Sequence, residues 1–219
     1  DMQVQEIQIE VASVVVATGW KPYDAKKLTN MGFSRVPNVI NNIMMERISS
    51  VSGPTKGKIL RPSDQKPVEK IVFVQCAGSR DENHLPYCSS ICCLGSLKHT
   101  KYVLEQNPEA KIYIFYIDIR TPGKYEDFVA KVQGEKNVKM IKGKVANIVA
   151  GENGNVLVEA EDIHNMNKVY LEVDMVVLAT GMESSLRGQE SVAGIELDEY
   201  GFVPAELQKI GIFSAGVAK

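Results

Sequence analysis

Two valine-rich stretches that end in the same tripeptide constrain the fold more than any other feature of this sequence. VASVVVATGW covers 11–20 and VDMVVLATGM covers 173–182, and both run into Ala-Thr-Gly without polar alternation. Such apolar runs are typical of strands buried on both faces, as in parallel sheets covered by helices. The glycine that ends each run allows a tight turn or a close approach to a ligand. The chain is therefore predicted to contain two similar buried strands far apart in the sequence.

The region between these stretches divides into two parts. Residues 20–68 contain five prolines among Gly and Ser, and only 38–50 has helical character, so we expect a connecting segment. From residue 70 onward the pattern predicts an α/β domain, with a parallel sheet and an antiparallel β-meander. The predicted elements are a strand at 70–75, a helix at 89–106 capped by Ser89 or Ser90, a strand at 110–118, a helix at 124–135, a meander over 139–173 and a final strand within 211–216.

All four cysteines lie in one short segment, QCAGSRDENHLPYCSSICC, as Cys76, Cys88, Cys92 and Cys93. A secreted disulfide framework spreads its bridges along the chain, so this cluster favours metal or redox chemistry. In a dinucleotide-binding unit, a short glycine-rich turn leads from the strand to a helix N-terminus that faces the pyrophosphate. Here the turn is extended to about a dozen residues, and charged side chains occupy it. We therefore expect four thiolates to converge where nucleotide phosphates would otherwise bind.

Several occupants are compatible with four thiolates. A [4Fe–4S] cluster is commonly held by four cysteine sulfurs, although C-x11-C-x3-C-C is not one of the usual ferredoxin patterns. A structural zinc site with four cysteines more often uses separated pairs than adjacent residues. A redox disulfide and simple burial of the thiols are further alternatives. The residues alone leave these alternatives open.

The composition excludes several classes of function. The 25 basic and 27 acidic residues are interspersed and give a net charge of −2, so neither nucleic acid nor an anionic membrane is an expected partner. No apolar run approaches the ~20 residues of a membrane span. The N-terminal DMQVQEIQIE lacks the features of a signal peptide, so we expect a cytoplasmic protein without direct membrane insertion. No Ser-His-Asp, HExxH or paired-carboxylate arrangement supports hydrolytic chemistry.

The order of these parts resembles the flavoproteins with two dinucleotide-binding domains, such as the thioredoxin reductases, which have an FAD/NAD(P)-binding, Rossmann-like fold. In that family the NAD(P)-binding domain is inserted into the FAD domain, between the two Ala-Thr-Gly strands. The resemblance implies that 1–19 and 183–219 are parts of a flavin domain, that 20–68 connects, and that 69–182 form the inserted domain with the cysteines. Because no GxGxxG loop occurs in the sequence, the flavin domain is incomplete, and we expect a fragment of a longer flavoprotein.

In detail the sequence is similar to the heterodisulfide reductase A-subunit family, which includes flavin subunits of the quinone-interacting oxidoreductase complex of sulfate reducers. VVVATGWKPYDA, SGPTKGKILRPSD, YIDIRTPGKYEDF and, most specifically, IVFVQCAGSRDENHLPYCSSICC carry this similarity. It implies an electron-transfer oxidoreductase with FAD in the full-length protein, a [4Fe–4S] cluster on the four cysteines, and other subunits of a heterodisulfide-reductase-like or quinone-interacting complex as partners. The implied cofactor-binding residues are Ala17, Thr18, Gly19, Thr180, Gly181 and Gly216.

Two other functions remain as alternatives: an NAD(P)H-dependent flavoprotein disulfide reductase domain, and a zinc-stabilised scaffold domain. The first is disfavoured because both a C-x-x-C dithiol and a glycine-rich phosphate loop are missing from the sequence. Val217 stands where related pyridine-nucleotide reductases place an aspartate after their last glycine. This difference also tells against an ordinary pyridine-nucleotide reductase.

A few further polar residues have candidate roles. Asp118 ends a predicted strand, at the position of a ribose-binding acid, and we expect it to cap or to pair with Arg120 instead. His84 in the cysteine loop is a possible ligand but is expected to be exposed. His99 and His164 are expected at the surface of a helix and of a turn, respectively.

Overall fold

The computed structural model describes residues 6–189 and 194–219, which form two compact units. The larger unit is Tyr23–Gly181, and the smaller one combines the chain up to Pro22 with the chain from Met182 onward. Residues 1–5 of the expected flavin segment 1–19 lie outside the described residues, as do 190–193 of the segment 183–219. The predicted α/β fold, with a parallel sheet and antiparallel strands, is confirmed.

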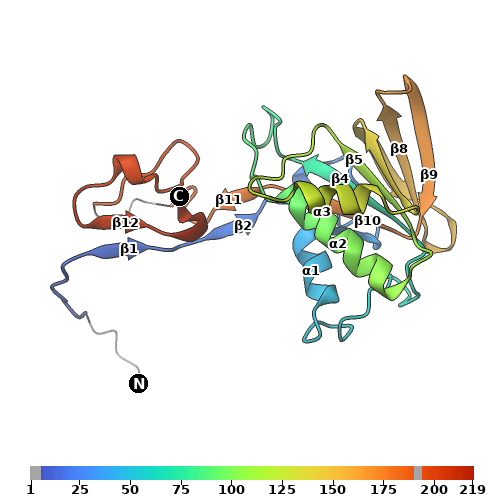
Figure 1. Ribbon diagram of the computed structural model, residues 1–219. Coiled ribbons are helices and arrows are strands. Elements are labelled where there is room, and N and C mark those ends of the chain that lie inside the picture. The colour runs from blue at the N-terminus through green and yellow to red at the C-terminus, as the bar shows by residue number, and fades with distance from the viewer. Residues whose placement is uncertain (1–5, 190–193) are drawn as a thin grey trace. The chain divides into compact units, whose positions relative to one another are not determined.

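The larger unit is built around a five-stranded parallel sheet (Figure 1). Its strand order is β3-β10-β4-β5-β6, and every neighbouring pair runs parallel. The second valine-rich stretch forms the interior strand β10, in which every residue is buried. An interior strand with a packed layer on each face needs apolar residues on both sides, which explains the absence of alternation. The strands are β3 (Val39–Asn41), β4 (Lys70–Ala77), β5 (Lys111–Tyr116), β6 (Val138–Lys142) and β10 (Met175–Thr180).

Three helices, α1 (Asn42–Ser49), α2 (Cys92–Gln106) and α3 (Glu126–Gln133), lie on one face of this sheet (Figure 1). Leu97 and Val103 of α2 are buried in one cluster with side chains from the sheet. Burying each such side chain contributes about 1.5–3 kcal/mol, so packing on the sheet holds α2 in place. The sheet residues in this cluster are Ile40, Ile71, Phe73, Ile112, Ile114, Met175 and Val177.

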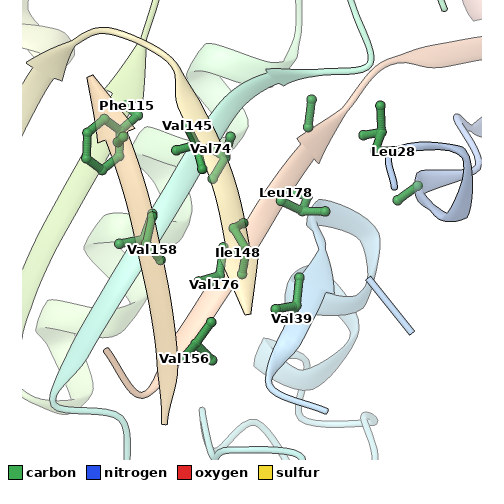
Figure 2. Close-up of a cluster of buried hydrophobic side chains, with 14 of the residues drawn as sticks. Leu28, Val39, Val74, Phe115, Val145, Ile148, Val156, Val158, Val176 and Leu178 are labelled. Carbon is green, nitrogen blue, oxygen red and sulfur yellow. The ribbon is translucent and has the colours of Figure 1, made fainter. Parts of the chain in front are cut away.

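An antiparallel meander covers the other face of the sheet. It consists of β7 (Val145–Ala150), β8 (Val156–Asp162) and β9 (Asn167–Val173), in the predicted order and with the predicted turns. Figure 2 shows Ile148, Val156 and Val158 of this layer beside Val176 and Leu178 of β10. The predicted meander began too early, because 138–142 form the parallel edge strand β6.

The expected connecting segment 20–68 contributes directly to the larger unit. Val39–Asn41 form β3, which pairs with β10, and Asn41 caps α1 by accepting a hydrogen bond from the N–H of Met44 at 2.8 Å. The side chain of Met45 is fully buried against the sheet. Arg61, although charged, is also buried, and its guanidinium donates to Asn155 and to the carbonyl of Asn153. This segment therefore completes the sheet and its core.

The smaller unit holds the first valine-rich stretch. Val14–Val16 of this stretch form β1, which pairs in parallel with β12 (Ile212–Ser214) from the predicted C-terminal strand. Val15 is 61% exposed and only Val16 is buried, so the prediction of a strand buried on both faces is wrong for this stretch. The physical reason is that this sheet has two strands, and the buried cluster beside it is small. A second pair, β2 (Trp20–Pro22) and β11 (Met182–Ser184), is antiparallel.

Candidate functional site

The carboxyl end of β4 carries the first cysteine in an unusual backbone conformation. Cys76 has a φ of 54°, and the pairing of β4 with β10 shifts register beside it. Gly78 and Arg80 also have positive φ, so the chain coils tightly as it leaves the strand. The N–H of Leu85 returns to the carbonyl of Gly78 at 3.0 Å, and the N–H of Arg80 donates to Tyr87 at 3.1 Å. The cysteine loop, residues 77–91, therefore contains its own backbone hydrogen bonds.

Helix α2 begins at Cys92, and Cys93 follows in its first turn. The predicted cap at Ser89 or Ser90 is wrong, because Ile91 precedes the helix and no side chain caps it. Ser90 instead has a φ of 56°, which continues the turn. The first N–H groups of a helix lack partners inside the helix and carry partial positive charge, which favours anionic sulfur at this position.

The four cysteines lie near one another, and all four are free thiols. Each thiol is close enough to the other three to interact with them electrostatically. Three separate segments bring them together: the end of β4, the loop and the start of α2.

Backbone groups surround these sulfurs at hydrogen-bonding distance. The N–H of Arg120 donates to Cys93 Sγ at 3.4 Å, and the N–H of Ser90 donates to Cys88 Sγ at 3.4 Å. Cys92 Sγ lies 3.5 Å from the carbonyl oxygen of Thr180. N–H donors directed at sulfur are among the features by which proteins tune iron–sulfur centres.

Burial governs the protonation of these thiols. It raises the pKa of Cys92 to about 12, and the neighbouring cysteines add to the increase. Burial also raises the pKa of Cys76 and of Cys93, while Arg80 opposes the increase at both. Four thiolates cannot share this buried space without positive charge between them. Either protons or a cationic centre must therefore accompany them.

The four thiols supply the type of ligand that a [4Fe–4S] cluster commonly uses. Among the described residues, no three His, Cys, Asp or Glu side chains are arranged to bind one metal ion. A [4Fe–4S] core is larger than a single zinc ion, so its ligand sulfurs stand further apart while still facing a common centre. Gln75 and Ser96 are buried, and their polar side-chain atoms have no hydrogen-bond partner. Gln75 precedes Cys76 at the end of β4, and Ser96 lies one turn beyond Cys92 in α2.

A charged group that the sequence did not reveal completes this site. Arg80 forms an ion pair with Asp118, across 38 residues of sequence. Asp118 also pairs with Arg120 at 3.4 Å, which confirms the predicted partner but shows that this partner is one of two. In the sequence, the charged residues of the cysteine loop were the signal that could have suggested a role for Arg80 at this site.

The predicted cofactor-binding residues fall into two groups. Ala17, Thr18 and Gly19 follow β1, and Gly216 follows β12, so all four lie at the carboxyl ends of one parallel pair. Gly19 and Gly216 have φ values of 68° and 63°, and nothing lies within 4 Å of where a Cβ would be. These positions offer open space for a ligand, and their role in FAD binding stays a prediction.

Thr180 and Gly181 are located in the larger unit, beneath the cysteine loop. Thr180 is fully buried, and its hydroxyl donates to Asn42 at 3.0 Å. A Cβ on Gly181 would lie 2.1 Å from Ser79 Oγ and 2.8 Å from Leu85 Cδ1. In this structure Thr180 contacts Asn42 and Cys92, whereas Gly181 lies against the loop, and their predicted contact with a cofactor stays a prediction.

Comparisons with known proteins give matches in both sequence and fold. No protein-family model matches the chain. It is 35% identical over its whole length to the first iron-sulfur A-subunit of the CoB--CoM heterodisulfide reductase of Methanopyrus kandleri. It is 37% identical over its whole length to the A-subunit of the H(2)/formate:CoB-CoM heterodisulfide,ferredoxin reductase of Methanococcus maripaludis. The chain belongs to the heterodisulfide reductase A-subunit family. It spans 35% of the length of each of these two relatives.

Solved structures show the fold of this family member. The chain superposes on the thioredoxin reductase of Lactococcus lactis with a TM-score of 0.54 and 11% identity, and on that of T. acidophilum with a TM-score of 0.52 and 13% identity. Each match covers 94% of this chain and 57% of the solved chain. Within the described residues of this family member, every helix is too short or too polar to cross a membrane.

The histidines differ partly from expectation. His99 is buried, and its Nε2 lies 2.8 Å from a carboxylate oxygen of Glu46, so the predicted surface position is wrong. His84 is half-buried, and its Nδ1 lies 2.7 Å from the hydroxyl of Tyr23. His164 is exposed in a turn, as predicted. Because α2 lies along the sheet, its buried face repeats every three to four residues, and the spacing from Ser96 to Val103 could have identified His99.

Proposed function

We propose that this chain is the part of a heterodisulfide-reductase-like flavoprotein oxidoreductase in which Cys76, Cys88, Cys92 and Cys93 hold a [4Fe–4S] cluster. The observation that carries the proposal is the convergence of the four thiols at the carboxyl end of a parallel sheet and the start of α2. In dinucleotide-binding folds this place receives the ligand. When bound, such a cluster supplies one-electron transfer at a potential tuned by its surroundings, and FAD supplies flavin redox chemistry.

The residues of this chain would set the position of the cluster and its electrostatic environment. The cysteines fix the centre between β4 and α2, while the N–H groups of Arg120 and Ser90 direct positive ends of dipoles toward the sulfurs. The buried loop residue Leu85 and the neighbouring strand β10 restrict access of water from the sheet side. We propose that residues 1–19 and 183–219 form parts of the FAD domain, with Ala17, Thr18, Gly19 and Gly216 toward the flavin.

The names of the relatives suggest the kind of complex in which the complete protein works. Their names describe subunits of heterodisulfide reductases, some of which also involve hydrogen, formate or ferredoxin. We infer that the complete protein carrying this chain exchanges electrons with other subunits of such a complex, or with a quinone-interacting one, in the cytoplasm. The two alternative functions have weaker support. A structural zinc site usually uses separated cysteine pairs rather than adjacent cysteines, and a disulfide reductase requires a C-x-x-C dithiol, which the sequence lacks.

The test is to purify the complete protein without oxygen and measure iron, sulfide and zinc. Each of the four single Cys→Ser variants is expected to lose about four iron atoms per protein and the matching part of the broad visible absorption. Ser90→Gly is a matched control, because it changes the same loop at a position with positive φ and keeps the N–H that donates to Cys88. Unchanged iron in the cysteine variants, or stoichiometric zinc in the unmodified protein, would refute the proposal.

A further inference from the structure

Asp118 joins two arginines beside the cysteines. One of its carboxylate oxygens pairs with Nη1 of Arg80, and the other lies 3.4 Å from both Nε and Nη2 of Arg120. Arg80 comes from the cysteine loop, whereas Asp118 and Arg120 follow the end of β5. A carboxylate that accepts from two guanidinium groups restricts both of them, because each loses freedom when the pair forms.

Each arginine also reaches the thiols. Arg80 lies within electrostatic range of Cys76 and Cys93, and Arg120 lies within electrostatic range of Cys88. The main-chain N–H of Arg120 donates to Cys93 Sγ at 3.4 Å. Three of the four cysteines therefore interact with one or both of these two arginines. The two arginines and Asp118 form a connected set beside the cysteines.

The charges in this set do not cancel. Two guanidinium groups remain charged at any physiological pH, and a single carboxylate balances only one of them. Arg80 is the better shielded of the two, with 23% of its side chain exposed, against 49% for Arg120. Solvent screens exposed charges more strongly, so Arg80 should act more strongly on the cysteine site than Arg120 does.

We propose that Arg80 and Arg120, positioned by Asp118, raise the reduction potential of the centre held by the four cysteines. This inference rests on the proposed function. When the site accepts one electron from a donor, its negative charge increases by one, and no covalent bond forms or breaks. A net positive charge nearby stabilises the more negative state, so it makes reduction easier. The arginines are positioning and tuning residues, since they act through the cysteine ligands.

The test is a redox titration of the complete protein, purified without oxygen and followed by electron paramagnetic resonance. The signal that is lost in Cys88→Ser identifies this centre. Arg80→Gln should lower its midpoint potential, Arg120→Gln should lower it less, and the double variant should lower it most. At a fixed potential, the double variant should show at least a tenfold smaller ratio of reduced to oxidised centre, which is about 59 mV for one electron. Arg80→Lys should recover most of the effect because it keeps the charge.

Lys136→Gln is the matched control, because it removes one positive charge from the opposite end of the sheet, where Lys136 pairs with Glu109. Its midpoint potential should equal that of the unmodified protein. Unchanged potentials in both arginine variants, with the signal retained, would overturn the inference. Equal shifts in Arg80→Lys and Arg80→Gln would also overturn it, since they would indicate altered structure. Absence of the signal from the unmodified protein would instead refute the proposed function, so the two failures are distinguishable.

Discussion

The hydroxyl of Ser79 lies directly over Gly181, 2.1 Å from the point that a Cβ on this glycine would occupy. Gly181 ends the second Ala-Thr-Gly stretch, and Ser79 lies three residues beyond Cys76. The missing side chain allows the cysteine loop to pack against the end of β10. In the larger unit, the glycine of the repeated tripeptide thus leaves the space that Ser79 and Leu85 of the loop occupy.

Replacing Gly181 with alanine should therefore destabilise the loop and its attachment to β10. The added methyl group overlaps Ser79 and Leu85, and such overpacking costs about 1–3 kcal/mol. The thermal midpoint of the unit should fall, by about 2–4 °C for each kcal/mol at this size. Gly95→Ala is the control, because nothing lies within 4 Å of its Cβ position and alanine favours a helix interior by about 0.5–1 kcal/mol. A change in flavin content without loss of stability in Gly181→Ala would contradict this account.

Arg61 should be essential for the packing of three segments. Its guanidinium donates to Asn155 Oδ1 at 3.0 Å and to the carbonyl of Asn153 at 2.7 Å, and it pairs with Asp174 at 3.4 Å. Arg61→Met should lower the free energy of unfolding by about 2–3 kcal/mol, as expected for the loss of buried charged hydrogen bonds. Arg61→Lys should recover less than half, because an ammonium group cannot reproduce the planar set of donors.

Lys168→Met provides the comparison for Arg61, since it breaks an exposed ion pair with Glu159, which solvent screens, and should change the stability very little. Chemical denaturation followed by circular dichroism measures all three variants. A loss in Arg61→Met no larger than that in Lys168→Met would show that the buried contacts contribute little.

His99 should make the protein less stable as the pH falls from 7 to 5. Burial between Phe73, Tyr102 and Glu46 lowers the pKa of His99 below its usual 6.5, although its hydrogen bond to Glu46 opposes this. Below about pH 6.5 the unfolded chain binds a proton that the folded chain does not bind, so stability decreases, by at most about 1.4 kcal/mol per pH unit. His99→Gln should flatten the stability profile in this range.

His164→Gln is the matched control for this measurement, because it removes a histidine from an exposed turn. Denaturation midpoints between pH 5 and pH 7 give the comparison. Lys98 also binds Glu46, at 2.8 Å, so the carboxylate keeps a cationic partner when His99 is replaced. An equally steep profile in His99→Gln and in the unmodified protein would exclude His99 as the cause.

The sequence predicted those elements whose environment is set by local pattern. β10 and β4 are continuous apolar runs, and the meander alternates between buried and exposed residues with clear turns. The three residues of β3 were missed because so short a strand carries no period, and it is held by pairing with β10. The exposure of Val15 was missed because an apolar run predicts a strand but does not show whether other elements pack on both of its faces.

The grouping of the four cysteines was predictable from the sequence, whereas the structure around them was not. Composition and spacing placed the four cysteines together, but the helix start was predicted at a serine, whereas the loop adopts positive φ at Ser90 and α2 begins at Cys92. The pair between Arg80 and Asp118 depends on the path of a long loop, and no local rule specifies that path. Long-range charge pairs of this kind require coordinates.

Nicotinamide cofactors should not bind at the cysteine end of the sheet. In nucleotide-binding units of this type, an acid after the second strand contacts the ribose, and the loop after the first strand leaves room for the pyrophosphate. Here Asp118 is engaged by Arg80 and Arg120, and the cysteine loop follows the first strand. A ligand present at 100 times its dissociation constant would stabilise the fold by about 2.7 kcal/mol, so binding would be visible as a rise in the thermal midpoint. We expect no rise with NADH or NADPH at millimolar concentration. A rise that disappears in Arg80→Gln would show that the arginines bind a nucleotide, and the assignment of this place to the cysteine-held centre would then be wrong.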